Sequence, residues 1–524
     1  MKTDIIISFL IGAAAAVSCG KPVPTSGILE VTGGKVQGVV ADELVVFKGI
    51  PFAAPPVGEL RWKGPQPVNP WDTVLVADSF SPGPYANMPF GQQSEDCLYL
   101  NVWTPAVTGG EKLPVMVWLY GGGFSMGNAA FYDSAPVARK GVVFVAPNYR
   151  VGRLGFMAHP ELDAENPEGV SGNYGILDQI AALKWVQDNI AAFGGDPRKV
   201  TVFGESAGAI SVSMLCASPL ARGLFCGAIS QSGGSFGPIR KKSYPGENMK
   251  TLRMAEEDAL AYQMSVGASS LADLRAMDAK ALSAQSEVTG GAWPVVDGYV
   301  IPDDQYRMYE AGNFNDVALL IGYNSDEGDS FEFYAEPKDH IANVRKRYGP
   351  FADTLMKAYP MSEESVPKTG RDLGRDAAFG WHTWVWGRLQ NEHGHSPVFM
   401  YYFDQDPGYR EGDVRYGHGS PHGQDVNFVF NSFRGEVSEA DAALCGYMMR
   451  YWTNFAKYGD PNGEAEDASL PHWPRFENED SRIMVLKSDA PHPVDMVDEA
   501  SLRVLDSYFS WRRSPEGAAW AERQ

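Results

Sequence analysis

Four short segments of the chain are almost continuously apolar. They comprise residues 113–120, 142–146, 317–322 and 398–403. A strand buried on one face alternates apolar and polar residues, whereas a strand covered on both faces is apolar throughout. These four segments therefore predict the centre of a parallel β-sheet that lies between layers of helices.

Helical spacing occurs between and after these segments. Apolar residues at 176, 180, 183, 186, 190 and 193 repeat with the period of one helix face, and residues 444–458 show a second amphipathic pattern. Residues 244–290 indicate charged helices inserted over the top of the sheet. The alternation of strands and helices predicts the α/β class, with a large, mostly parallel central sheet flanked by helices.

The first strands of the chain have a different pattern. Residues 28–32 and 36–40 are typical of antiparallel strands joined by a glycine turn. No later stretch has the composition of an interdomain linker, so we expect residues 20–524 to form a single domain with inserted helices.

The pattern Gly-x-Ser-x-Gly occurs three times, at residues 123–127, 204–208 and 233–237. In a nucleophile elbow, a sharp turn between a strand and a helix exposes a serine hydroxyl above the sheet, and glycines avoid collisions across the turn. Only the second match follows a short apolar strand and precedes an uninterrupted helical run. The sequence therefore predicts Ser206 as the nucleophile of a serine hydrolase.

A serine nucleophile requires a base to take its proton, an acid to orient the base and donors for the oxyanion. In α/β-hydrolases the acid and then the histidine follow the serine along the chain. Asp326 and Glu327 come just after the third apolar segment, and His418 and His422 follow the fourth. The residues alone do not separate Asp326 from Glu327, or His418 from His422.

A run of three glycines, residues 121–123, follows the first apolar segment. Bare backbone lets N–H groups point at a substrate oxygen, so this run suits an oxyanion hole.

Motifs along nearly the whole chain resemble those of the type B carboxylesterases, the α/β-hydrolase family that includes bacterial para-nitrobenzyl esterases and the cholinesterases. Taken in order they are far more specific than any single pattern. The matching stretches are residues 47–56, 94–102, 120–124, 148–150, 175–185, 193–197, 204–208, 294–298, 324–328, 422–425 and 451–457.

The resemblance implies a role for particular residues. Glu327 matches the family's acid and His422 its base, and both would act with Ser206 through an acyl-enzyme intermediate. The activity would then rise with pH through an apparent pKa near that of histidine, roughly 6 to 7. The oxyanion donors match the backbone N–H groups of Gly122, Gly123 and Ala207, and the supporting positions near the triad match Glu205 and Ser232.

The chain departs from the family at Asp425, where a glutamate is common. A shorter carboxylate keeps the capacity for hydrogen bonds, so we expect little change. Two alternatives to a carboxylesterase stay open: a lipase that cleaves long-chain esters, and a binding homologue without catalysis. The charges in residues 244–290 argue against an apolar lipase lid, and the intact set of three triad residues argues against a binding homologue.

Composition bears on the partners. Lys and Arg number 44 against 65 acidic residues, which gives a formal net charge of −21. A phosphate backbone would be repelled, which argues against nucleic acid as a partner. We expect a small-molecule ester as substrate, a monomer, and no cofactor or metal. Five cysteines in 524 residues do not form a disulfide framework, and free thiols are favoured over a bridge between Cys216 and Cys226.

The N-terminus has the pattern of an export signal. Residues 5–17 are apolar or small apart from Ser8, too short to span a bilayer but suited to a signal peptide. Small residues before Cys19 resemble a bacterial lipoprotein cleavage site. We expect residues 1–19 to be a signal peptide and Cys19 to carry a lipid anchor, with ordinary secretion as the alternative. Either route leads to the bacterial periplasm, the outer membrane or the medium.

Aromatic residues offer candidates for a substrate gorge. Five of them lie in segments that would reach the site: Trp381, Trp384, Trp386, Phe331 and Phe333. Any one of them is nevertheless more often an ordinary core residue.

Overall fold

The structure of the protein is a computed structural model. It describes residues 25–86, 91–107, 109–284, 293–331, 336–433, 435–464, 469–488 and 490–524. The expected signal peptide, Cys19 and Phe333 lie outside the described residues.

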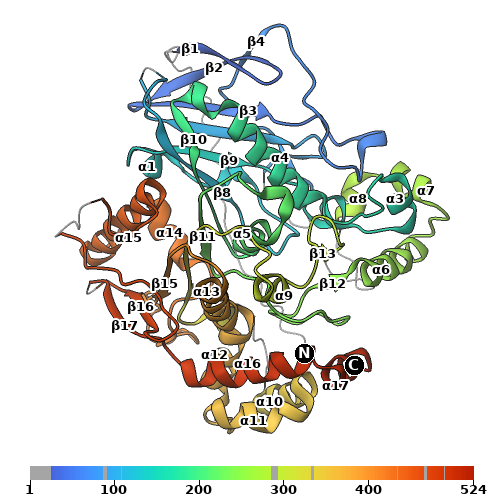
Figure 1. The fold of residues 1–524 in the computed structure, drawn as a ribbon, viewed down its shortest axis with the longest axis vertical. Helices are drawn as coiled ribbons and strands as arrows, with labels where there is room; N and C mark the ends of the chain where they lie inside the picture. The colour runs from blue at the N-terminus through green and yellow to red at the C-terminus, as the bar shows by residue number, and fades with distance from the viewer. Residues whose placement is uncertain are drawn as a thin grey trace.

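A 13-stranded sheet forms the centre of the molecule (Figure 1). Its centre, from β9 through β8, β10, β11, β14 and β15 to β16, is parallel throughout, and antiparallel strands extend it at both ends. In spatial order the strands are β1 (Thr25–Val31), β2 (Gly34–Ala41), β3 (Leu44–Pro51), β7 (Tyr99–Thr104), β9 (Val143–Pro147), β8 (Leu113–Leu119), β10 (Gly195–Glu205), β11 (Gly227–Gln231), β14 (Ala318–Asn324), β15 (Val398–Phe403), β16 (Arg482–Leu486) and β17 (His492–Asp495), with β4 (Val74–Val76) paired to β2.

The apolar runs of the sequence occupy the middle of this sheet. Every residue of β9, β14 and β15 is buried, and β8 is buried from its second residue on. By contrast, β2 alternates between buried and more exposed positions, as a strand with one covered face does. The predicted α/β class with a mostly parallel central sheet is confirmed.

Helices cover the parallel part of the sheet. Helix α5 (Ala207–Ala217) packs against β10 and β11, α13 (Trp381–His393) against β14 and β15, and α15 (Glu439–Tyr458) against β8 and β10. The expected helix over residues 176–193 is α4 (Tyr174–Asn189), followed by a 3₁₀ turn (Ile190–Phe193). All eleven residues of α5 are buried, which explains why its sequence is small and apolar rather than amphipathic.

Two groups of helices lie away from the sheet. The charged segment predicted as inserted helices forms α6 (Leu252–Ser265), α7 (Leu271–Ala276) and α8 (Ala279–Ser283), on the right in Figure 1. At the bottom of that view lie α10 (Pro337–Tyr348), α11 (Ala352–Ala358), α12 (Val366–Arg375), α16 (Glu499–Arg513) and α17 (Pro515–Glu522).

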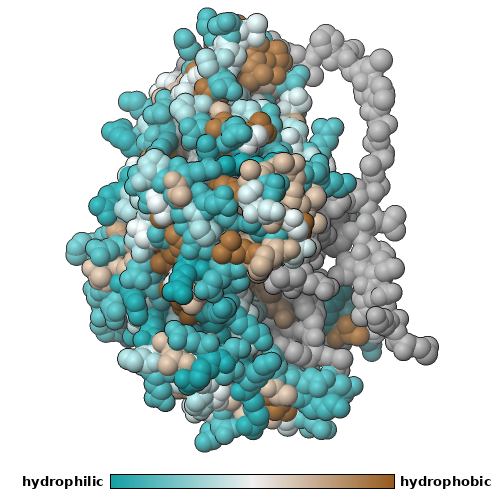
Figure 2. Space-filling view, turned by 90° about the vertical axis from the view of Figure 1, so that its right-hand side faces the viewer, coloured by the Kyte–Doolittle hydropathy of each residue, from teal (hydrophilic) through white to brown (hydrophobic). Residues whose placement is uncertain are grey.

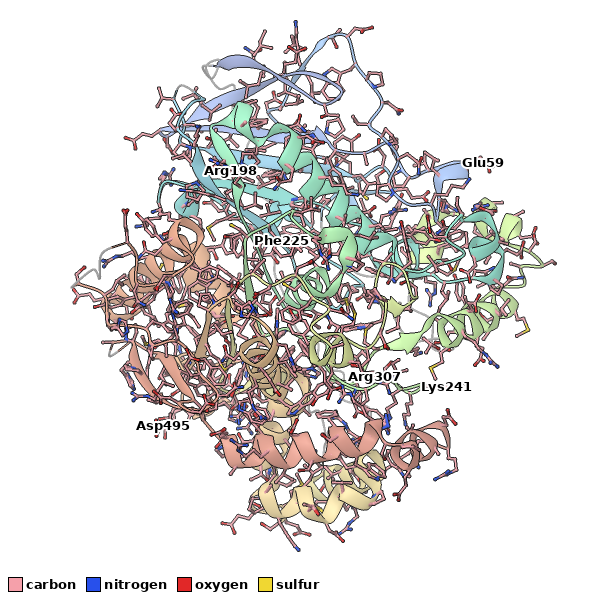
Figure 3. All side chains as sticks on the ribbon, viewed as in Figure 1. Glu59, Arg198, Phe225, Lys241, Arg307 and Asp495 are labelled. Atoms are coloured by element: carbon pink, nitrogen blue, oxygen red, sulfur yellow. The ribbon has the colours of Figure 1, made fainter. Side chains whose placement is uncertain are left out.

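The surface is largely polar. The face shown in Figure 2 is mostly hydrophilic, with separate small hydrophobic patches, and the labelled charged side chains of Glu59 and Asp495 lie at the periphery in Figure 3. Among the described residues, no helix has both the length and the apolar character needed to cross a membrane. Cys97, Cys216, Cys226 and Cys445 are free thiols, as expected.

Candidate active site

The carboxyl ends of five parallel strands meet at one edge of the sheet, and each is followed by a candidate site residue. The glycine run follows β8, Ser206 follows β10, and Ser232 follows β11. Glu327 follows β14, and His422 ends the long loop after β15. Ligand sites of parallel α/β sheets form at this edge.

A sharp turn between β10 and α5 holds Ser206. Its φ of 54° and ψ of −124° lie outside the regions that L-residues favour. The Ser206 N–H donates to the Gln231 carbonyl at 2.9 Å and fixes the turn against β11. A Cβ at Gly208 would lie 1.9 Å from the Leu119 oxygen, so only glycine fits there. The local geometry is that of a nucleophile elbow.

His422 connects Ser206 to Glu327. Its Nδ1 lies 2.6 Å from Glu327 Oε2, and its Nε2 lies 2.8 Å from Ser206 Oγ. A carboxylate only accepts, so Nδ1 carries a proton, and in the neutral imidazole Nε2 then accepts from the serine hydroxyl. The three side chains thus have the contacts needed to remove the Ser206 proton.

The rival residues that the sequence left open have other partners. His418 contacts Asp329 at 2.9 Å through Nδ1, and Asp326 accepts from the Arg371 guanidinium at 2.8 Å. Of the three motif serines, only Ser206 hydrogen-bonds a histidine within the described part of the chain. Ser125 donates to the Gly122 carbonyl at 3.2 Å.

Glu327 is fully buried, and its Oε1, the oxygen that does not contact His422, accepts two further hydrogen bonds. Oε1 accepts from Ser232 Oγ at 2.5 Å and from the Asn324 backbone N–H at 2.7 Å. Ser232 therefore contacts the acid directly. Asn324 was not singled out from the sequence, although it begins the stretch 324–328 that supported the family resemblance.

Glu205 adds a second carboxylate beside the histidine. Its Oε1 lies 3.2 Å from His422 Nε2. Burial raises the pKa of Glu205 to about 7, opposed by the charge of His422 and assisted by Asp425 and Glu327. For His422, burial disfavours the charged form, but Glu205 and Glu327 outweigh it and raise its pKa to about 9.

Asp425 lies at the start of α14 (Gln424–Phe430), completely buried. It accepts from Gln231 Nε2 at 2.8 Å and Tyr401 Oη at 2.9 Å, and from Asn324 Nδ2 at 3.3 Å. Burial, which disfavours the charge, raises its pKa. The shorter carboxylate thus has three donors, which tie α14 to β11, β14 and β15.

A cavity of about 300 Å³ opens beside the serine. Gly123 and Ala207 line it with Ser206, and Ala207 begins α5, so its N–H has no partner within the helix. Gly122 has a φ of 113° and its Cβ would lie 2.4 Å from the Met126 oxygen. Gly123 and Ala207 thus place backbone next to Ser206 in the cavity wall.

Some of the aromatic candidates line the cavity beside Ser206, and others lie in the hydrophobic core. Phe331 lines the cavity, together with Phe379 and Trp293, which the sequence did not single out. Trp381, Trp384 and Trp386 are fully buried in the core and do not line this cavity. Helical spacing did not reveal Phe379 because it lies on a π-helical turn (Asp376–Gly380).

Comparisons with known proteins agree with this geometry. The model of the carboxylesterase family matches residues 25–500. Fumonisin B1 esterase of Sphingopyxis macrogoltabida is 36% identical over 509 residues, covering 90% of this chain and 88% of the relative. Human cocaine esterase is 33% identical over 508 residues, with 88% of each chain covered. A solved structure of PNB esterase superimposes with a TM-score of 0.78 at 32% identity, covering 91% of this chain and 99% of the other.

A family match over most of the chain and relatives above 30% identity lead to one conclusion. The chain belongs to the carboxylesterase family and is a serine carboxylic-ester hydrolase with the α/β-hydrolase fold.

Proposed function

We propose that Ser206, His422 and Glu327 are the catalytic triad of this esterase and that the backbone N–H groups of Gly122, Gly123 and Ala207 form its oxyanion hole. The observation that carries the proposal is the continuous chain of contacts from Ser206 Oγ through the imidazole to Glu327, at 2.8 and 2.6 Å.

The reaction proceeds in two steps. His422 Nε2 takes the hydroxyl proton while Ser206 Oγ bonds to the ester carbonyl carbon, and the backbone donors stabilise the oxyanion. The protonated imidazole then gives its proton to the alkoxy oxygen as the ester C–O bond breaks. A water molecule, deprotonated by His422, attacks the acyl-enzyme, and its proton returns to Ser206 when the acid leaves. Glu327 holds the imidazole in place through its contact with Nδ1.

Glu205 and Ser232 support the triad. Ser232 orients Glu327 by its hydrogen bond, and Glu205 places a carboxylate beside the nitrogen that receives the proton. Both act on the triad residues rather than on the substrate.

The test is ester hydrolysis by the purified protein and its Ser206→Ala variant, with p-nitrophenyl butanoate as probe. Loss of the nucleophile is expected to lower kcat by about 10⁶-fold, because triad residues act as a unit. The variant Cys226→Ala, at an exposed thiol, is a matched control and should retain wild-type turnover. Turnover unchanged in Ser206→Ala would refute the triad.

The cavity size suggests the substrate class: a small-molecule ester whose acyl group is larger than acetyl. A panel of p-nitrophenyl esters tests this, and kcat/KM should rise from acetate to butanoate. A long-chain ester distinguishes a lipase, because only a lipase should gain activity above the critical micelle concentration of its substrate.

We also propose that the chain is an exported monomer, with residues 1–19 as signal peptide and Cys19 as the lipidated residue. The apolar run of residues 5–17 and the small residues before Cys19 support the export and the lipidation. Fatty-acid labelling in a bacterial host should modify the wild type but not Cys19→Ser, and size-exclusion chromatography of the released protein tests the monomer.

A further inference from the structure

An aromatic ring covers one face of the His422 imidazole. The ring of Phe379 lies parallel to it, with 4.9 Å between centroids and 11° between planes. Phe331 meets the imidazole more nearly edge-on, at 5.1 Å and 66°, and lies 5.5 Å from Phe379. Ser206 and Glu327 engage the imidazole nitrogens in the ring plane, whereas Phe379 engages its face.

The backbone that holds Phe379 is unusual. Residues Asp376–Gly380 form a single π-helical turn between α12 and α13. Such turns insert an extra residue into a helix and occur often at functional sites. The turn changes the helical register, which gives Phe379 a direction that it would not have in an uninterrupted α-helix.

Buried polar contacts fix this turn. Asp376 accepts from Arg375 Nε at 2.7 Å and from Tyr359 Oη at 2.8 Å. Gly380 leaves room for that carboxylate, since a Cβ there would lie 2.8 Å from Asp376 Oδ1. Phe379 itself is only 5% exposed. Its ring is therefore set by the scaffold rather than by the substrate.

A phenyl face attracts a cation, and the imidazole becomes a cation when it takes the Ser206 proton. We propose that Phe379 is a positioning residue that holds the imidazole in line with Ser206 and stabilises its protonated form. The inference rests on the proposed function, because it assigns a role to the face of the same histidine.

Other charged groups also face His422 and act in the same direction. These are Glu205 from β10, Glu327 after β14 and Asp425 from α14. They remain in place when Phe379 is changed, so any effect of a substitution reports the aromatic ring alone. Asp329, in the 3₁₀ turn Glu327–Ser330, and His418, in the loop before His422, bond to each other.

The test compares pH profiles of kcat/KM for p-nitrophenyl butanoate. The acidic limb of the profile is the part in which kcat/KM rises with pH. In Phe379→Leu this limb should move to lower pH by about 0.5 to 1 unit, because loss of the ring face disfavours imidazolium. The limiting kcat/KM should fall about 2- to 30-fold. Phe379→Tyr keeps an aromatic face and should restore both the limb and the rate. Phe314→Leu removes a buried ring outside the cavity. The acidic limb of this variant's pH profile should stay at the wild-type position.

A packing role would give a different result. If Phe379→Leu loses activity without moving the limb, or if Phe379→Tyr behaves like Phe379→Leu, the inference is wrong. His422→Gln separates this failure from that of the triad: wild-type turnover in His422→Gln would refute the proposed function itself, whatever Phe379 does.

Discussion

At the scale of single residues, the two carboxylates beside His422 have a consequence for pH. They favour imidazolium, and the pKa of His422 rises from its ordinary value of 6.5 to about 9. The base must be neutral to accept the Ser206 proton, so a raised pKa keeps it inactive to a higher pH. We therefore expect kcat/KM to rise with pH through an apparent pKa above 7, higher than the 6 to 7 expected from the sequence. An apparent pKa of 7 or lower would contradict this electrostatic account.

Glu205→Gln isolates one of those carboxylates. The amide is isosteric but uncharged, so imidazolium loses a partner 3.2 Å away and the acidic limb should move down by about 1 pH unit or more. Glu363→Gln removes a charge from an exposed position and serves as the control for net charge. Equal pH profiles for all three proteins would show that Glu205 does not act on the base.

The residues also differ in how far the sequence revealed them. Ser206 followed from its strand, turn and helix context alone. Asp326 and Glu327 are adjacent, and His418 and His422 share a loop, so no periodicity separates them; the family resemblance favoured one of each pair. Phe379 had no sequence signal, because its contact with His422 depends on a π-helical turn.

At the scale of elements, the elbow depends on the close approach of α5 to β8. A Cβ at Gly208 would lie 1.9 Å from the Leu119 oxygen, and backbone cannot move aside as a flexible side chain does. Gly208→Ala should therefore lower the midpoint of urea unfolding and the esterase activity together. If Gly208→Ala lowered neither the urea midpoint nor the activity, the tight packing of the elbow would be contradicted.

Gly446 in α15 provides the matched control. A Cβ there meets nothing within 4 Å, and the residue is helical. Gly446→Ala should raise the free energy of unfolding by about 0.4 to 1 kcal/mol, since alanine loses less backbone entropy on folding. The same substitution thus has opposite effects at two helical glycines, according to their surroundings.

Element by element, the sequence anticipated the centre of the fold better than its margins. Continuous apolar runs predicted β8, β9, β14 and β15 because both faces of these strands are buried. The short strands β12 (Lys250–Thr251) and β13 (Val295–Val296) have two residues each and pair with one another. Two residues are too few to show a period, so tertiary contacts alone define them.

At the scale of the whole molecule, a buried ionic cluster joins the C-terminal helices to the cavity wall. Glu247 is fully buried and accepts from Arg240 at 3.1 Å, with Arg347 and Arg512 each 3.6 Å away. Pro245 and Gly246, next to it, line the cavity. Arg240 also lies 5.3 Å from the ring centroid of Trp520 in α17, and Figure 3 labels Lys241, the next residue in the chain.

Glu247→Gln should destabilise the protein by about 3 to 5 kcal/mol, because three buried guanidinium groups lose their common counter-charge. Urea unfolding measures this. Asp353→Asn breaks the exposed ion pair with Arg345. We expect little change in the free energy of unfolding for this variant, because solvent already screens the pair. Equal stabilities of the two variants would contradict the importance of the cluster.

The central claim is that Ser206 is the nucleophile, and covalent labelling tests it most directly. A fluorophosphonate reacts with an activated serine and leaves a stable adduct that mass spectrometry can assign to a peptide. We expect one adduct per chain on Ser206, with labelling abolished in Ser206→Ala and strongly reduced in His422→Gln. An adduct on Ser125 or Ser235, the serines of the other two motifs, or undiminished labelling of Ser206→Ala, would contradict the account.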